Sequence, residues 1–251
     1  MSKEIKDILK EITLKSNGKI SRENSYPSRY LKEKGIQLKE KIIELKNCGV
    51  GRRFKSKTFS NFEKKRHPDA YKICLDYARG FIANFKTEGT GLFLYGSVGT
   101  GKTHLAASII DYIARMHKRK ITIGWFVFIT AIELLQKIKD GFNKSDDDSL
   151  DDFKRCSLLI IDDFGTNRTT GWTDEILYSI VNFRYENKLP LIITTNLSID
   201  KFKESNDERL MSRIFEMCKG IKFSGPDYRL EISKSKNMDQ RLKDIEKDMK
   251  K

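Results

Sequence analysis

Short apolar runs bounded by turn residues dominate the hydrophobic pattern of the chain. They cover residues 92–95, 121–128, 158–161, 189–195 and, more weakly, 220–223. An unbroken apolar run of this length predicts a strand that is buried on both faces. We therefore expect a sheet whose strands lie inside the molecule.

Apolar residues at helical spacing separate these runs. A capping box is indicated where Thr130 precedes Glu133 by three positions at a helix start. The expected helices cover residues 67–85, 104–113, 130–142, 174–187 and 206–216. Strands and helices thus follow one another along the chain, and the sequence indicates an α/β fold.

A glycine-rich motif follows the first apolar run and leads into a helix. Its pattern is G-x-x-x-x-G-K-[ST], and in a strand, loop and helix context it predicts a phosphate-binding loop. Glycines let backbone amides approach a phosphate, Lys102 neutralises it, and the Thr103 hydroxyl ligates Mg²⁺. A glycine-rich turn with a chance Lys-Thr is the alternative. The expected ATP-binding residues are Gly96, Ser97, Val98, Gly99, Thr100, Gly101, Lys102, Thr103 and His104.

Two carboxylates end the apolar run at residues 158–161. Ligands of open α/β sheets bind at the carboxyl ends of the strands, so this is where a metal is expected. We assign Mg²⁺ binding to Asp162 and polarisation of the attacking water to Asp163. Helix capping by the same two residues is the alternative.

Three further polar residues are candidates for catalysis. Asn196 ends a predicted strand, where it orients the attacking water, senses the γ-phosphate or merely occupies a turn. Arg209 and Arg213 are four residues apart and share a helix face. Spacing alone favours an ordinary solvated surface for that face.

Charge points to a polyanionic partner. The 251 residues carry a formal net charge of +14, and residues 1–57 hold 16 Lys and Arg against 7 Asp and Glu. Nucleic acid fits this excess, although lysine-rich proteins without nucleic acid also show it. No apolar stretch has the length of a membrane span, no signal peptide is evident, and the four cysteines are scattered, so we expect a cytoplasmic protein with reduced core thiols.

Two amphipathic helices are expected within residues 2–14 and 31–45. Their apolar stripes either pack on the rest of the chain or bind a partner protein. The predicted organisation is a basic helical arm over residues 1–50, an ATPase domain over 51–232 and a charged tail over 233–251.

Taken together, these motifs resemble the AAA+ ATPases of the DnaC/DnaI helicase-loader type, to which the IstB transposition helpers are close. The resemblance spans residues 46–232 and is strongest in segments 48–62, 96–105, 158–165, 189–197 and 208–213. It implies a core of five parallel strands sandwiched by helices. It also implies that Asn196 is the sensor 1 residue, that Arg213 is the arginine finger for a neighbouring subunit, and that Arg209 supports it.

The resemblance implies an ATPase that uses ATP and Mg²⁺ to load the replicative DnaB-type helicase onto single-stranded DNA, as a primosome component. An IstB-like helper that binds duplex DNA and recruits a transposase is the alternative, and a nucleotide switch without turnover is a third. Asp163 replaces the glutamate common at its position, and no lid arginine is evident after Phe223. We therefore expect slow turnover that homo-oligomerisation and DNA stimulate.

Overall fold

A parallel five-stranded sheet forms the centre of the molecule. The computed structural model describes residues 49–84, 90–116, 126–143, 148–165, 171–204, 207–231 and 233. All neighbouring strands are parallel, in the order β2-β3-β4-β1-β5. The strands are β1 (Gly91–Gly96), β2 (Phe126–Thr130), β3 (Leu158–Asp162), β4 (Leu191–Thr195) and β5 (Cys218–Phe223). The predicted five-stranded α/β core is confirmed.

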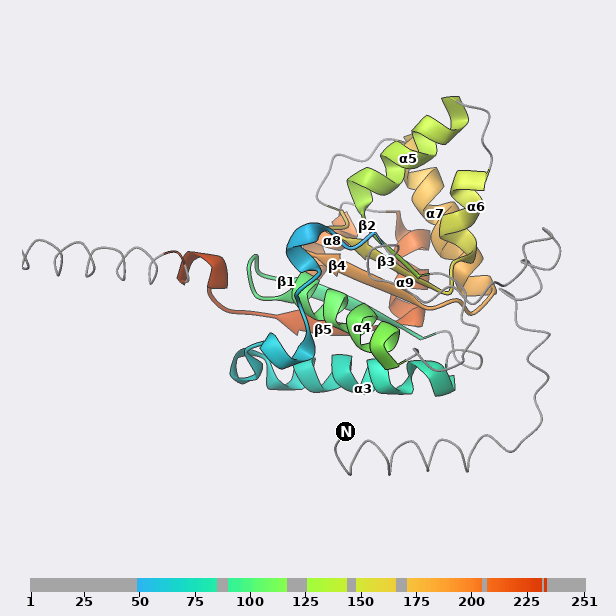
Figure 1. The fold of residues 1–251 in the computed structure, drawn as a ribbon. Coiled ribbons are helices and arrows are strands. Elements are labelled where there is room, and N and C mark those ends of the chain that lie inside the picture. The colour runs from blue at the N-terminus through green and yellow to red at the C-terminus, as the bar shows by residue number, and fades with distance from the viewer. Residues whose placement is uncertain are drawn as a thin grey trace, which may run out of the picture.

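Helices cover both faces of this sheet (Figure 1). Alternate residues of a strand point to opposite faces, so Leu92 and Leu94 pack with the first helix layer and Phe93 with the second. The first layer consists of α3 (Pro68–Asn84) and α4 (Lys102–Met116). The second consists of α5 (Ala131–Asn143), α6 (Asp148–Arg155), α7 (Gly171–Glu186), α8 (Ile199–Glu204) and α9 (Glu208–Met217).

The predicted capping box opens α5. The backbone N–H of Glu133 donates to the Thr130 hydroxyl over 3.2 Å, and the Glu133 carboxylate accepts from the Thr130 N–H over 3.3 Å. The preceding strand begins at Phe126, later than the predicted start, and residues 121–125 lie outside the described part of the chain.

An irregular segment leads into α3 and lies across the α4 side of the core. It contains the short 3-10 turns η3 (Arg52–Phe54), η4 (Phe59–Asn61) and η5 (Lys64–Arg66). Val50, Phe59 and Phe62 are buried in the same apolar cluster as α4. The predicted arm lies outside the described residues up to position 48, so its helices and its boundary stay predictions.

Three cysteines are core residues. Cys74, Cys156 and Cys218 are buried and free of disulfides, as expected, whereas Cys48 lies outside the described residues. Burial raises the pKa of the Cys74 thiol to about 12, which makes it unreactive at neutral pH. Among the described helices, none has the length and apolar character needed to cross a membrane.

Candidate active site

Most of the predicted site residues meet at one edge of the sheet. The glycine-rich loop follows β1, Asp162 and Asp163 end β3, and Asn196 follows β4. Because all the strands are parallel, their carboxyl ends share an edge, which is where open α/β sheets bind ligands.

Lys102 is a buried cation inside the glycine-rich loop. Its ammonium group donates to the carbonyl oxygens of Gly96 over 2.8 Å and Ser97 over 2.6 Å. Burial lowers its pKa to about 8. Within the described residues, no carboxylate lies at ion-pair distance from it. A buried cation that only carbonyl groups hold fits a site built for an anionic ligand such as a phosphate.

Asp162 and Thr103 form the pair that the sequence predicts for Mg²⁺. The Thr103 hydroxyl donates to Asp162 Oδ1 over 2.9 Å, although the two residues lie on α4 and β3. Asp162 is only 3% exposed, and this burial raises its pKa to about 6. A hydroxyl and a carboxylate oxygen beside a phosphate loop are the donors that Mg²⁺ prefers. The residues present therefore fit this ion.

Asp163 is held in an unusual backbone conformation. Its φ is 54°, in the left-handed region, which is costly for a residue with a side chain. Two contacts stabilise it: its N–H donates to Thr194 Oγ1 over 3.0 Å, and its carboxylate accepts from Asn196 Nδ2 over 2.9 Å. The carboxylate is thereby held by Asn196, the residue predicted to act with it.

Thr194 connects Asp162 and Asp163, and the sequence motifs did not predict this role. Its hydroxyl also donates to Asp162 Oδ1 over 2.5 Å, and the residue is fully buried in β4. In the sequence, Thr194 is one position of a strand-like run. Its polar side chain, two residues before Asn196, was the available signal.

Phe62 supports the phosphate loop from the α4 side. Gly101 has a φ of 101°, and a Cβ atom there would lie 2.7 Å from the Phe62 ring. The ring also packs edge-on against His104, with a centroid distance of 5.2 Å. His104 Nε2 lies 3.0 Å from the Thr58 carbonyl oxygen. The side chain of His104, predicted to bind nucleotide, therefore contacts the segment before α3.

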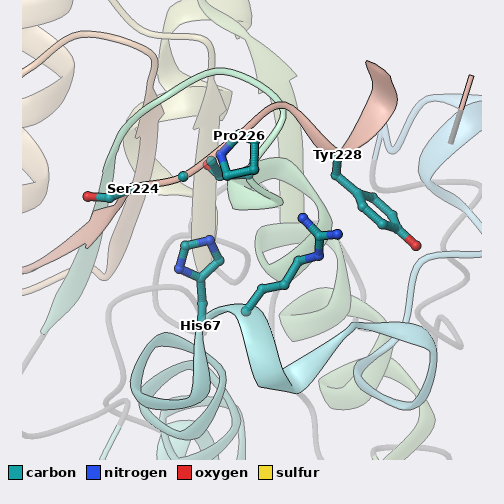
Figure 2. A pocket seen from close by; sticks show the side chains of 7 residues that line it. His67, Ser224, Pro226 and Tyr228 are labelled. Carbon is teal, nitrogen blue, oxygen red and sulfur yellow. The ribbon is translucent and has the colours of Figure 1, made fainter. Parts of the chain in front are cut away.

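A pocket of about 190 Å³ continues from the phosphate loop. Figure 2 shows His67, at the start of α3, facing the segment from Ser224 to Tyr228 that follows β5. The guanidinium carbon of Arg66 lies 4.5 Å from the Tyr228 ring centroid, and Arg66 also pairs with Glu231. The lining residues are Arg66, His67, Thr100, Ser224, Gly225, Pro226 and Tyr228.

The segment after β5 contacts the loop directly. A Cβ atom on Gly99 would lie 1.7 Å from Asp227 Oδ1, and the Tyr228 N–H donates to the Gly99 carbonyl oxygen over 3.2 Å. Burial is the main cause of the lowered pKa of Lys102; Asp163 and Asp162 oppose it by raising this pKa, and Arg229 lies close enough to help lower it. No arginine after Phe223 was expected at this site from the sequence, because the return of the chain is a tertiary feature.

Arg209 and Arg213 lie on α9, in the helix layer opposite α4. Both guanidinium carbons are 4.9 Å from the ring centroid of Tyr178 on α7. Within the described residues, no hydrogen bond or ion pair joins either arginine to the phosphate loop. The fold therefore places Arg209 and Arg213 apart from the other predicted site residues of the same chain.

Known proteins share this architecture. The family model for the bacterial DnaA ATPase domain matches residues 57–221 of this chain. The uncharacterized protein YqaM of Bacillus subtilis (strain 168) is 29% identical over 206 residues, covering 78% of this chain and 64% of YqaM. The replicative helicase loader DnaI of the same organism is 28% identical over 155 residues, covering 57% of this chain and 48% of DnaI. The chain thus spans roughly half to two thirds of these relatives.

A solved structure agrees with the sequence matches. The crystal structure of the DnaC helicase loader superimposes with a TM-score of 0.58 at 26% identity, covering 69% of this chain and all of that chain. The residues that match the family, 57–221, include the phosphate loop, Asp162, Asp163 and Asn196.

Proposed function

Since the chain belongs to the family of the bacterial DnaA ATPase domain, and is thus an AAA+ ATPase, we propose that it loads the replicative DnaB-type helicase onto single-stranded DNA. The similarity of the chain to the replicative helicase loader DnaI and to the structure of the DnaC helicase loader supports this function. It places the protein in the cytoplasm at the initiation of DNA replication.

One observation carries the ATPase part of the proposal: two acidic residues with different partners stand beside a buried lysine. Asp162 accepts from the Thr103 hydroxyl, whereas Asp163 accepts from the Asn196 amide. We assign metal binding to the first pair and water orientation to the second. A bound Mg²⁺ would supply Lewis-acid stabilisation of charge on the phosphates.

The pocket next to the loop is our candidate for the base and ribose of ATP. It shares Thr100 with the phosphate loop, and its lining includes the rings of His67 and Tyr228 and the side chain of Pro226, beside Arg66, Ser224 and Gly225. Aromatic and apolar surfaces of this kind favour a planar base. Arg229, near Lys102, is a second cation that would meet the phosphates from within the same chain.

Arg213 is our candidate for the residue that completes the site of a neighbouring copy. It lies on the helix layer away from its own loop, and within the described residues no carboxylate neutralises it. An arginine supplied across an interface is worth about 10³ to 10⁵ in rate in related phosphoryl transfers. Turnover should therefore be slow for the isolated chain and should rise with assembly and with single-stranded DNA.

A binding experiment tests the loader function. The full chain is mixed with a purified hexameric DnaB-type helicase, and the mass of the complex is measured with ATP, with ADP and without nucleotide. We expect a complex that releases the helicase when ATP is hydrolysed on single-stranded DNA. Absence of a complex in every nucleotide state, together with binding of duplex DNA, would instead favour the transposition-helper function.

We also propose that the basic arm, residues 1–50, makes the contact with the helicase, and a truncation tests this role. Deleting residues 1–47 keeps Gly49 and Val50; Val50 is buried in the core, and a Cβ atom on Gly49 would meet the Phe128 carbonyl. We expect the shortened chain to bind ATP normally and to lose the helicase. If it still forms the complex, the helicase contact lies on the ATPase domain.

A further inference from the structure

Arg213 is held in one orientation by its own subunit. Its Nε–H donates to Asn182 Oδ1 over 2.5 Å, and its Nη1 donates to the Arg209 carbonyl oxygen over 3.1 Å. A guanidinium group has five N–H donors. In the described part of the chain, the Nη2 group has no hydrogen-bond partner, so its two donors and one on Nη1 are left to bind a phosphate.

Two tyrosines of α7 lie beside this guanidinium group. Its central carbon lies 4.9 Å from the Tyr178 ring centroid and 5.8 Å from that of Tyr185. The Tyr185 hydroxyl is itself tied to Glu216 of α9 over 2.7 Å. Stacking of this kind attracts the cation and leaves its positive charge intact.

The neighbouring arginine provides a contrast. Arg209 stacks on the same Tyr178 ring but forms an ion pair with Asp207 at 3.1 Å. Arg213 has an uncharged amide where Arg209 has a carboxylate. Of these two arginines, Arg213 therefore keeps the full charge that an anionic ligand would recognise.

The orientation of the Asn182 amide is set by a third residue. Its Nδ2 donates to Glu186 Oε1 over 2.9 Å, one turn later in α7. A carboxylate accepts hydrogen bonds and donates none when ionised, so the NH₂ end of the amide faces Glu186 and the oxygen faces α9. The two hydrogen bonds therefore run in one direction: Arg213 donates to Asn182, and Asn182 donates to Glu186.

We propose that Asn182 is a positioning residue for Arg213, holding it ready to contact the nucleotide of an adjacent copy. This inference rests on the function proposed above for Arg213. A free arginine side chain loses rotamer freedom when it binds, and an anchored one has already lost it. Removing the anchor should slow the hydrolysis that depends on Arg213 and should leave the subunit's own nucleotide pocket unaffected.

Mixed oligomers separate these two effects. Lys102→Ala chains keep Arg213 but lack a working pocket, and Arg213→Ala chains keep the pocket but lack the arginine. Mixing the two full-length proteins should restore hydrolysis, measured as phosphate release at saturating ATP. Asn182→Ala is then introduced into one partner at a time. On the Lys102→Ala chain, which supplies Arg213, it should reduce the recovered rate at least about tenfold, the effect of a lost charge-assisted hydrogen bond. On the Arg213→Ala chain, the change should stay below about twofold, since that chain supplies only the pocket.

The same mixtures carry their own controls. Ser179→Ala, on the same helix one turn earlier, should have no effect in either position. If the parent mixture does not recover, Arg213 does not act in trans, and both the proposed function of Arg213 and this inference fail. If the parents recover but Asn182→Ala slows both mixtures equally, Arg213 keeps its function and only the positioning role of Asn182 is refuted.

Discussion

Thr194 donates its hydroxyl hydrogen to Asp162 over 2.5 Å and accepts the Asp163 backbone N–H over 3.0 Å. One buried hydroxyl therefore controls both acidic residues. Its bond to Asp162 favours the ionised carboxylate and opposes the effect of burial on the pKa. Its bond to Asp163 helps to hold the left-handed backbone that turns the second carboxylate toward Asn196.

Replacing Thr194 by valine should therefore impair hydrolysis without removing ATP binding. The substitution keeps the shape of the side chain, raises the pKa of Asp162 further and weakens its hold on Mg²⁺. We expect the turnover number to fall about tenfold to a hundredfold, in line with the loss of a hydrogen bond to a charged group. Phosphate release as a function of Mg²⁺ concentration measures this effect.

Thr195→Val is the matched control. Thr195 is also fully buried in β4, but its hydroxyl accepts the Leu197 N–H and, within the described part of the chain, forms no hydrogen bond with Asp162 or Asp163. Its turnover should stay within about threefold of the parent. Equal losses in the two variants would mean that the effect comes from strand packing.

Lys102→Ala should abolish tight ATP binding, because it removes the buried cation of the phosphate loop. Titration with a fluorescent ATP analogue measures the affinity, which should weaken at least about a hundredfold on the loss of a charged contact. Lys219→Ala removes the same charge from an exposed site on β5 and should bind normally. Asp162→Ala should retain part of the affinity and lose Mg²⁺-dependent hydrolysis. Unchanged ATP affinity in Lys102→Ala would refute the assignment of the site.

Phe62→Leu should weaken ATP binding through the phosphate loop. The ring lies directly against Gly101, so a smaller side chain leaves the loop less well supported. Phe59→Leu is the control, since Phe59 is equally buried but packs on Tyr71 and Tyr112. Both variants should lose about 1 to 2 kcal/mol of unfolding free energy, and only Phe62→Leu should bind ATP more weakly. Parallel losses of affinity would contradict the specific role of Phe62.

Arg184→Met should destabilise the fold without a direct effect on the site. Arg184 is fully buried, and its guanidinium group donates to the carbonyl oxygens of Phe153, Lys154, Cys156 and Pro190 at 2.6 to 3.1 Å. Its removal leaves buried acceptors unsatisfied, which should cost at least about 3 kcal/mol. Urea unfolding measures the loss. Arg79→Met breaks an exposed ion pair with Asp76 and should cost less than about 1 kcal/mol.

The parts of this protein that depend on local pattern could be predicted from the amino-acid sequence. The phosphate loop, the acidic end of β3 and the capping box at Thr130 are contiguous motifs whose chemistry needs fixed residue spacings. The unbroken apolar runs likewise predicted strands buried on both faces, because only a strand covered by two helix layers can be apolar throughout. These motifs also predicted that Thr103 and Asp162 lie together, because the carboxyl ends of parallel strands share one edge; the hydrogen bond between them agrees.

The distant residues that complete the site could be identified only from the three-dimensional fold. Thr194 bridges two carboxylates from a neighbouring strand, Phe62 supports Gly101 from the other side of the loop, and Arg229 returns to Lys102 from beyond β5. None of these contacts has a sequence spacing of its own, because each depends on strand order and on the path of a connecting segment. The same reason separates Arg213 from its own phosphate loop: α9 packs on the opposite face of the sheet from α4, a consequence of chain topology that no local pattern encodes.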